Sequence, residues 1–384
     1  MPGIRKAAAL GWHVVTVDYS PENVGHRYGH ESVNCSTVDK DGVLKAARAL
    51  NVDGICTFSS DVAIPTVAFV CEQLELPGAS PVAAEIMATK NRFRAFQLAQ
   101  GLPAPGFVSG SDLAAMIEGI QELDPPIVFK PVDTSGSRGV TRLDELEPDA
   151  VERAFLTAQG FSRSKTVCVE EFVPGIEVGG DAILVDGEIA FIAMTHKHLA
   201  GFVVTGHSLP TNIPGEDQGR IVTQLKATCA ALGYVSGPLN FDAIVSPGDV
   251  TILEMSARNG GNGIPAVIER ATGVDVETAA LQLALGQVPV FPRSPGTNRG
   301  AGSLVFGSPV GGRLVNIRSP AALRRDTPEV FGVHYVKQVG QSVDAFTHNG
   351  NLIGFVLFDC EDSARYVRLT RKIMDSLDVK VQPE

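Results

Sequence analysis

Hydrophobic and polar positions follow two different patterns along the chain, and the change falls near residue 89. Before it, apolar runs at 13–18 and 54–60 are separated by helical patterns over 4–11, 41–50 and 63–74. Helices that alternate with short apolar strands are typical of a parallel, doubly wound sheet. Such a sheet normally begins on a strand, whereas this pattern begins on a helix. We therefore expect its first strand and glycine turn to be missing, either by truncation or because the fold does without them.

After residue 89, strands follow one another directly. A helical pattern opens near Lys90, and apolar runs at 125–132 and 166–175 predict strands. Asp186-Gly187 lies between two further runs and is a strong hairpin signal, as is the PGD of 247–249. Paired strands in succession predict antiparallel sheets, so the fold class is α/β followed by an α+β part. The remaining expectations are helices over 265–274 and 276–287, a Pro/Gly/Arg boundary at 291–300, and short strands with a final helix over 363–377.

Composition narrows the functional class. The 384 residues carry a formal net charge of −11, which argues against a nucleic-acid surface. Six cysteines occur without a CxxC pair, as expected of reduced thiols. No apolar run reaches the ~18 residues that span a bilayer, and the N-terminus lacks a signal pattern. We therefore expect a soluble, cytoplasmic protein with no nucleic-acid or membrane partner.

The hairpin over 238–258 carries the most informative charges. A three-residue loop at 247–249 would place Ser246 opposite Val250 and Asp242 opposite Glu254. Period-two alternation then gives a polar face and a core face: Asn240, Asp242, Glu254, Ser256 and Arg258 on the first, and Phe241, Ala243, Val245, Leu253 and Met255 on the second. Two facing carboxylates require a cation, and oxygen ligands suit Mg²⁺. The alternative is a solvent-facing strip with Arg258 as its counter-ion.

Three other stretches can contact a nucleotide. Lys130 ends a strand, and the SGSRGV of 135–140 that follows is small enough for backbone N–H groups to approach an anion. In the VEEFVPGIE of 169–177, backbone can bind a flat base and Glu177 a ribose. The alternatives are a flexible surface loop, a charged strand end and, for Lys90, a solvated helix start. Neither GxxxxGK[ST] nor a GxGxxG at a strand–helix turn occurs.

Taken in order, Lys90, Lys130 with its Gly/Ser loop, the 169–177 stretch and the hairpin resemble the ATP-grasp superfamily. The resemblance covers most of the chain. It implies a pre-ATP-grasp domain over 1–88 that lacks its first strand, an ATP-grasp domain over 89–295 with a lid at about 126–190, and a C-terminal subdomain over 296–384.

Carried over by position, the resemblance implies ATP and Mg²⁺ as cofactors. Lys90 and Lys130 would contact the adenine side and the α- and β-phosphates. The mobile loop over the phosphates would comprise Ser135, Gly136, Ser137 and Gly139; the adenine and ribose would meet Glu170, Glu171, Phe172, Val173 and Glu177. Mg²⁺ would be held by Asp242 and Glu254, and Arg258 would stabilise the moving phosphoryl group. Many family members carry Asn where this chain has Ser256, so Ser256, alone or with Asn240, would replace that metal ligand.

A narrower resemblance concerns residues 195–211. Gly206-His207 followed by Pro210 is similar to the substrate segment of dipeptide-forming L-amino-acid ligases. His207 would then line the pocket and act with Arg258, whereas His196 and His198 are expected to be ordinary surface residues. The implied function is a carboxylate–amine ligase that forms an acyl phosphate and uses small-molecule carboxylate and amine substrates, amino acids above all. Dimers are common in that family. The alternatives are a bicarbonate-using carboxylase or carbamoyl-phosphate-type enzyme, a purine-pathway ligase, and a catalytically silent ATP-binding module.

Overall fold

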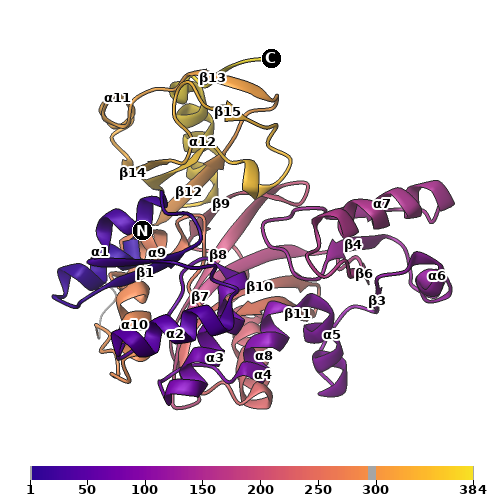
Figure 1. Ribbon diagram of the computed structural model, residues 1–384. Coiled ribbons are helices and arrows are strands. Elements are labelled where there is room, and N and C mark those ends of the chain that lie inside the picture. Colours follow the sequence, from indigo (N-terminus) through magenta and orange to yellow (C-terminus); the bar gives the residue numbers. More distant parts are fainter. Residues whose placement is uncertain (1, 293–299, 384) are drawn as a thin grey trace.

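The computed structural model describes residues 2–292 and 300–383, and its N-terminal part is a small α/β layer (Figure 1). Strands β1 (Val15–Asp18) and β2 (Glu31–Asn34) form a two-stranded parallel sheet. The helices and 3₁₀ turns of this layer are α1 (Pro2–Ala9), η1 (Val24–Tyr28), α2 (Lys40–Leu50), η2 (Asp61–Ala63), α3 (Ile64–Leu74) and α4 (Pro81–Ala88). The Asp39 carboxylate caps α2 by accepting from the Gly42 N–H, so α2 begins one residue before the predicted helix over 41–50.

The predicted strand over 54–60 does not form. Residues 54–58 take part in no backbone-to-backbone hydrogen bond within the described chain, and β1 pairs only with β2. A strand exists through its ladder, so an apolar run without a neighbour to pair with stays irregular. The expected small parallel sheet is present, with fewer strands than the pattern predicted.

A second, four-stranded antiparallel sheet stands apart from the N-terminal layer (Figure 1). Its strand order is β3-β6-β4-β5, from β3 (Phe107–Gly110), β6 (Val167–Glu171), β4 (Ile127–Pro131) and β5 (Thr141–Leu143). Helix α5 (Lys90–Ala99) leads into it, and α6 (Leu113–Gln121) and α7 (Pro148–Phe161) pack on it. We call this unit, residues 107–171, the small-sheet unit.

The largest element is an antiparallel sheet of eight strands in the order β11-β10-β7-β8-β9-β12-β16-β14. Its strands are β7 (Ile176–Val185), β8 (Glu188–Ala200), β9 (Val203–Leu209), β10 (Gly237–Ser246), β11 (Asp249–Ser256), β12 (Ala301–Phe306), β14 (Val330–Tyr335) and β16 (Gly354–Asp359). Asp186 and Gly187 connect β7 to β8 with φ of 51° and 81°. Positive φ at both positions is what a tight hairpin turn demands, so this predicted hairpin is confirmed.

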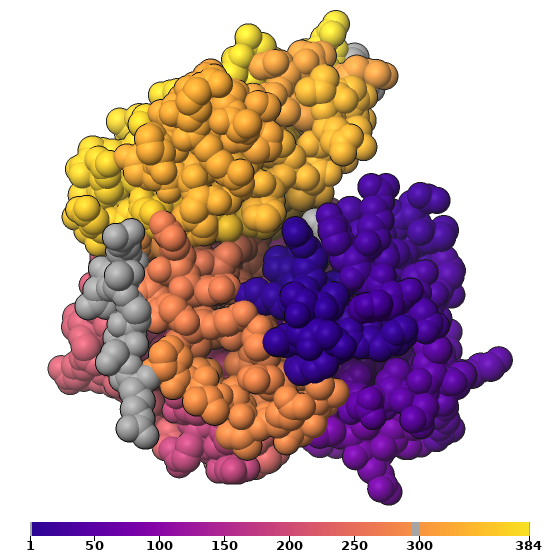
Figure 2. Space-filling model, turned by 90° about the vertical axis from the view of Figure 1, so that its left-hand side faces the viewer, coloured from indigo at the N-terminus to yellow at the C-terminus, as the bar shows by residue number. Residues whose placement is uncertain are grey.

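Helices cover this sheet, and the chain ends in a further lobe (Figures 1 and 2). The covering helices are α8 (Gly215–Leu232), α9 (Ile264–Thr272) and α10 (Val276–Ala284). The lobe adds a three-stranded sheet and two helices: β13 (Gly312–Asn316), β15 (Ser342–Val343), β17 (Lys380–Gln382), α11 (Pro320–Asp326) and α12 (Ser363–Leu377), with a 3₁₀ turn η3 (Asn349–Asn351). Helix α12 matches the predicted final helix. Residues 293–299 of the predicted boundary lie outside the described residues.

The β10–β11 hairpin has the predicted cross-strand pair but not the predicted loop. Ser246 pairs with Asp249, so the loop has two residues, not three, and Ser246 is not opposite Val250. A register shift beyond Asp242 adds one residue to β11 and restores Asp242 opposite Glu254.

The same bulge changes which side chains of β11 face the core. Ile252 and Met255 are buried there, whereas Leu253, expected in the core, is only half-buried. Side chains of α5 bind the carbonyls that the bulge exposes: Arg94 donates to Leu253 O at 2.8 Å and Gln97 to Ile252 O at 2.9 Å. Helix α5 therefore stabilises the irregularity that sets the position of Glu254.

Within the described residues, no helix is both long enough and apolar enough to cross a membrane.

Candidate functional site

Two carboxylates on adjacent strands, Asp242 of β10 and Glu254 of β11, form the centre of the site. Each lies beside a lysine: Lys197 Nζ is 2.8 Å from Asp242 Oδ2, and Lys90 Nζ is 3.9 Å from Glu254 Oε2. The two carboxylate side chains keep 28% and 33% of their exposure, so a ligand can reach both. Like charges this close on paired strands need cations nearby, and the two lysines supply them.

Lys197 connects three strands of the large sheet. It extends from β8 to Asp242 on β10 and to Glu177 on β7, whose Oε2 is 3.1 Å from its Nζ. Burial alone would lower the pKa of Lys197, but the two carboxylates outweigh burial and hold the pKa above its ordinary value. Lys197 therefore stays charged. Its two partners depend on the order of the strands, because β7 lies between β8 and β10.

Arg258 is paired with an acid that the sequence analysis missed. Arg258 Nε and Nη2 lie 2.9 and 2.6 Å from Asp61 Oδ1, and both side chains are almost buried. Burial alone would raise the pKa of Asp61, yet Arg258 and a hydrogen bond from Ser256 hold it below its ordinary value. Asp61 directly follows the apolar run 54–60, which predicts a strand. Ligand-binding residues of α/β layers often follow strands, so the sequence did contain a signal for Asp61.

The remaining Arg258 donors are nearly all used as well. Nη1 donates to Asn240 Oδ1 at 2.6 Å and to the Asn259 carbonyl at 3.1 Å. A guanidinium has five N–H groups. Since Nε and Nη2 each donate one bond to Asp61, a single N–H of Nη2 has no partner in the described chain.

Ser256 and Asn240 lie beside Arg258, but their polar atoms bind protein groups. The Ser256 hydroxyl donates to Asp61 Oδ1 at 2.5 Å, and Asn240 Nδ2 donates to Gly180 O and Asp181 Oδ1. The buried Asp181 also accepts from the Gly260 N–H, so it holds the two-glycine turn that follows Arg258. Burial raises the pKa of Asp181 to about 6, although these donors oppose the rise.

The two glutamates that end β6 bind residues of the small-sheet unit and of the segment that leads into it. Glu170 is fully buried between Lys130 and Arg94, at 2.6 Å and 3.2 Å. The carboxylate of Glu171 accepts from the Gly106 and Asp124 N–H groups, and the Phe172 N–H donates to Pro126 O. These contacts hold the chain in place where β6 leads into β7 of the large sheet.

The ion pairs of Glu170 should make the stability of the protein depend on pH. Burial alone would raise its pKa, but Arg94 and Lys130 lower the pKa to about 2 from an ordinary 4.5. Because the folded-state pKa is depressed, the stabilisation is fully present above pH 4.5 and is lost as pH falls through about 2. In urea titrations at pH 6, 4 and 3, the stability gap between the native chain and Glu170→Gln should therefore narrow with acid. The exposed Glu188→Gln should leave no gap at any of these pH values, and a constant Glu170 gap would contradict the ion-pair explanation.

The Gly/Ser loop after β4 lies against the large sheet and the C-terminal lobe. Ser137 Oγ donates to Phe202 O at 2.6 Å, and the Asn349 N–H donates to Gly136 O at 3.0 Å. Positive φ at Gly136, Ser137 and Gly139 bends the loop. N–H groups of 135–139 donate no hydrogen bond of normal geometry within the described chain, so they can bind an anion.

His207 is buried on β9, directly across from Lys197. Its Nδ1 lies 2.9 Å from Thr195 Oγ1, and that hydroxyl donates its one hydrogen to Gly179 O. His207 Nδ1 must therefore be the protonated nitrogen, which leaves Nε2 as an acceptor. Burial, and then Lys197, lower the pKa of His207 to about 3, so the ring is neutral near pH 7. His196 and His198 are half-buried, with His198 stacked on Tyr366 at 3.7 Å between ring centroids, so the expectation of ordinary surface residues is wrong.

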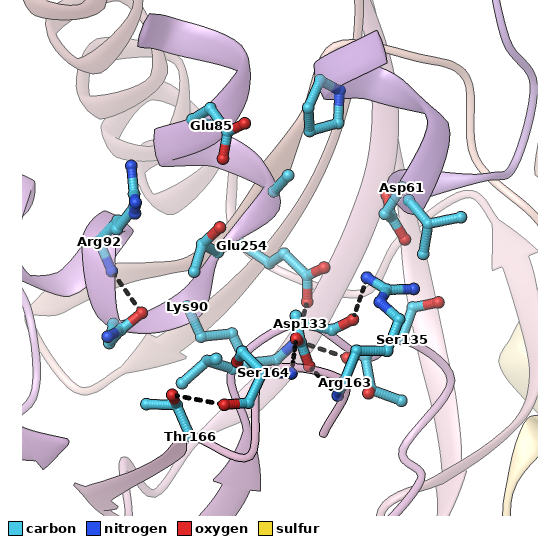
Figure 3. Close-up of a pocket in the computed structure, with 17 residues that line it drawn as sticks. Asp61, Glu85, Lys90, Arg92, Asp133, Ser135, Arg163, Ser164, Thr166 and Glu254 are labelled. Carbon is cyan, nitrogen blue, oxygen red and sulfur yellow. Dashed lines mark hydrogen bonds and ion pairs between the residues drawn. The ribbon is translucent and has the colours of Figure 1, made fainter. Parts of the chain in front are cut away.

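A cavity of about 360 Å³ opens beside the Lys90–Glu254 pair (Figure 3). Asp61, Lys90, Ser135 and Glu254 line it, so it joins the N-terminal layer, α5, the Gly/Ser loop and the hairpin. Lys90 Nζ also donates to Thr134 O at 2.8 Å, which connects the helix start to the loop. The structure thus gathers residues far apart in the sequence around one polar cavity.

A scan against protein-family models matches residues 123–266 to the ATP-grasp domain. The chain contains an ATP-grasp domain. The match covers the part of the small-sheet unit from β4 onward and the Asp242–Glu254 hairpin, but not β3, α6, Lys90 or Asp61.

Several known proteins are similar to the chain. It is 26% identical over 284 residues to carnosine synthase 1 from Homo sapiens, covering 68% of this chain and 34% of that protein. It is also 26% identical over 274 residues to alanine–anticapsin ligase from Bacillus subtilis, covering 65% and 58%. The chain therefore spans less than two thirds of these relatives.

The solved structure of an L-amino acid ligase from Bacillus licheniformis has the same fold. It superposes with a TM-score of 0.86 at 23% identity, covering 99% of this chain and 95% of that one. At this identity the likeness concerns the fold alone.

Proposed function

We propose that the protein is an ATP-dependent carboxylate–amine ligase that forms an amide bond through an acyl phosphate. The observation that carries this proposal is the facing pair Asp242 and Glu254, flanked by Lys90, Lys197 and Arg258 within an ATP-grasp domain. Phosphoryl transfer depends on positioning and charge neutralisation, which is what such a cluster supplies. The similarity to amino-acid-joining ligases supports the same reaction class.

Asp242 and Glu254 fit Mg²⁺. They are paired across two strands, both are partly exposed, and carboxylate oxygens are the ligands that Mg²⁺ prefers. No cluster of three or more His, Cys, Asp or Glu side chains suited to a metal occurs in residues 2–292 and 300–383. An ion held by these two side chains would thus complete its shell with phosphate and water oxygens, and would neutralise phosphate charge. Ser256 and Asn240 are proposed to act indirectly, by orienting Asp61 and Arg258.

The reaction proceeds in two balanced steps. A carboxylate oxygen of the acid substrate attacks the γ-phosphorus of ATP, the bond to the β,γ-bridging oxygen breaks, and ADP leaves. The amine nitrogen then attacks the acyl carbon, phosphate leaves, and the nitrogen loses a proton to give the amide. Lys90, Lys130 and the N–H groups of 135–139 would bind and orient the phosphates. The free N–H of Arg258 would donate to the moving phosphoryl group.

An amino acid is the substrate class that the Asp61–Arg258 pair suits. An α-amino acid carries an ammonium a few ångströms from its carboxylate. Asp61, which Arg258 holds in place at the cavity wall, offers a negative charge to that ammonium, while the one free N–H of Arg258 is left for the phosphoryl group. His207 Nε2, a hydrogen-bond acceptor with too low a pKa to store a proton near pH 7, could hold an amine or hydroxyl hydrogen.

Asp61→Asn should separate substrate recognition from nucleotide binding. We expect the KM for the amino-acid substrate to rise by about 10- to 100-fold, because a charge-assisted contact of roughly 1.5–3 kcal/mol is lost. The KM for ATP should change less than about twofold. Asp144→Asn, at an exposed carboxylate, is the matched control. An equal rise in both KM values would contradict the assignment of Asp61 to the amino acid.

The reaction class is tested by phosphate release from Mg-ATP over a panel of amino-acid pairs, with mass detection of the amide. Release that requires an acid and an amine together, with one ADP and one amide per phosphate, is the expected result. Release stimulated by bicarbonate without an amine would instead favour a carboxylase. If no pair stimulates release although ATP binds, the ligase proposal fails and a silent ATP-binding module is favoured.

A further inference from the structure

The C-terminal lobe reaches the Gly/Ser loop through Asn349, a residue outside the family match of 123–266. Asn349 begins the 3₁₀ turn η3, and its backbone N–H donates to Gly136 O at 3.0 Å. A Cβ placed on Gly136 would lie 3.4 Å from Asn349 Cβ, so the loop also packs closely on the turn. The lobe therefore supplies part of the surface on which the loop rests.

The side chain of Asn349 is bound to β9. Its Nδ2 donates to Val204 O at 2.7 Å, and the Val204 N–H donates to its Oδ1 at 3.1 Å. The ladder between β12 and β9 ends at Gly206, and the Asn349 amide continues it as a strand partner would. Asn349 is only 7% exposed, and both polar atoms of its side chain are used. This one residue therefore ties the loop to β9.

The loop also bonds directly to the hairpin formed by β8 and β9. Ser137 Oγ donates to Phe202 O at 2.6 Å, in the turn between the two strands. The same hairpin carries Lys197 and His207, which are paired across it and belong to the candidate site. The loop is thus attached to the hairpin by two routes, one direct and one through Asn349.

Arg138 adds a third contact between the loop and the turn. A Cβ placed on Gly350 would lie 2.7 Å from Arg138 Nε, so the guanidinium packs directly on the backbone of η3. Three successive loop residues are therefore held in place. The N–H groups of 135–139 nevertheless keep no backbone partner in the described chain, so they stay available to an anion.

We propose that Asn349 is a positioning residue for nucleotide binding, which ties the Gly/Ser loop to β9 and holds it closed with its N–H groups ready for the phosphates. Without the Asn349 amide, the Val204 N–H and C=O would be buried and unpaired while the loop is closed. Opening would let water reach them, so the loss of the amide favours the open loop.

One consequence rests on the proposed function. An amino-acid substrate bound against His207 would restrain β9 three residues from Val204. Because Asn349 ties β9 to the loop, a ligand on either side favours the closed loop, and such coupling is reciprocal. The amino acid should therefore tighten nucleotide binding, and the nucleotide should tighten amino-acid binding by the same factor.

Limited digestion with trypsin measures loop opening, because Arg138 is an exposed cleavage site within the loop. Cleavage after Arg138, followed by mass detection in the full chain, should be at least about tenfold faster in Asn349→Ala than in the native chain. Asn351→Ala is the matched control, since it removes an asparagine-to-backbone bond of the same turn that stays within the lobe, from Nδ2 to Ala345 O. It should leave the rate unchanged. Equal rates in the native chain and Asn349→Ala, or an equal rise in both variants, would overturn the proposal.

Nucleotide affinity separates positioning from a merely structural effect. In calorimetry with Mg²⁺ and the β,γ-imido analogue of ATP, the Kd should rise at least about fivefold in Asn349→Ala and stay native in Asn351→Ala. An amino acid that supports turnover should lower the native Kd by about fivefold or more and leave that of Asn349→Ala unchanged. A decrease of native size in Asn349→Ala would contradict the coupling.

A second variant covers the case in which Asn349→Ala does not fold. Asn349→Asp keeps the bond from the Val204 N–H and loses only the donor to Val204 O, so it should fold and be cleaved about threefold faster or more. A native cleavage rate in this variant would refute the tie to β9. Digestion needs neither ATP nor an amino acid. If no amino acid supports turnover, the ligase proposal fails, and the cleavage rates still decide whether Asn349 holds the loop.

Discussion

Replacing Arg258 with alanine is expected to lower kcat by about 1,000-fold while ATP still binds. The one unpartnered N–H of Arg258 is proposed to meet the moving phosphoryl group, so its loss removes an interaction made in the transition state. ATP affinity, measured by calorimetry, should change little. Single-turnover ADP formation is the kinetic readout, since it isolates the chemical step.

The same change also leaves Asp61 buried without its partner, which destabilises the fold. Thermal unfolding must therefore be measured beside activity. Arg258→Lys keeps the charge but loses the planar fork, and should remain folded with strongly reduced turnover. Arg270→Ala removes a surface arginine paired with Asp359 and is the matched control for a lost ion pair. If Arg258→Ala is stable and keeps near-normal turnover, the proposed role is wrong.

Asp242→Asn should raise the Mg²⁺ concentration required for half-maximal activity by at least about tenfold and lower kcat by roughly 100-fold. The carboxylate is proposed to hold the ion with Glu254, and an amide is a weaker, uncharged ligand. The measurement is a Mg²⁺ titration of ADP formation at fixed free ATP.

Asp242 also pairs with Lys197, so replacing Asp242 removes this ion pair as well as a proposed metal ligand. Two control variants separate the two effects. Asp249→Asn changes an exposed carboxylate at the other end of the same hairpin and should leave the Mg²⁺ titration unchanged. Lys197→Met removes the ion pair without removing a proposed metal ligand. If Lys197→Met shifts the titration as much as Asp242→Asn does, Asp242 acts by holding the lysine and not the metal.

The Asp242–Glu254 pair was predicted correctly from the sequence, although the predicted loop length was wrong. Period-two alternation correctly placed both acids on one face, because side-chain direction in a strand is a local property. The loop was predicted one residue too long, and the bulge in β11 cancelled that error. The bulge depends on Arg94 and Gln97, which bind its carbonyls from a helix about 155 residues away in sequence. No local pattern around Glu254 indicates that support.

For residues 54–60, the local pattern was clear but the predicted strand does not form. Their apolar, β-branched pattern predicted a strand, and the prediction was wrong because pairing requires a neighbour as well as propensity. Asp61, directly after this run, was missed for a related reason. Its importance comes from Arg258, 197 positions away, and this partner depends on how the N-terminal layer packs, which the position of Asp61 after the run does not show.

The sequence by itself determined what short-range rules control. These include the Asp186–Gly187 turn, the alternating faces of β10 around Asp242 and the ordered set of residues that resembles ATP-grasp proteins. Only the tertiary structure decided which charges meet. Strand order placed Lys197 between Glu177 and Asp242, and the N-terminal layer brought Asp61 to Arg258. The physical reason is that backbone preferences act within a few residues, whereas the partner of a buried charge is set by packing between elements distant in sequence.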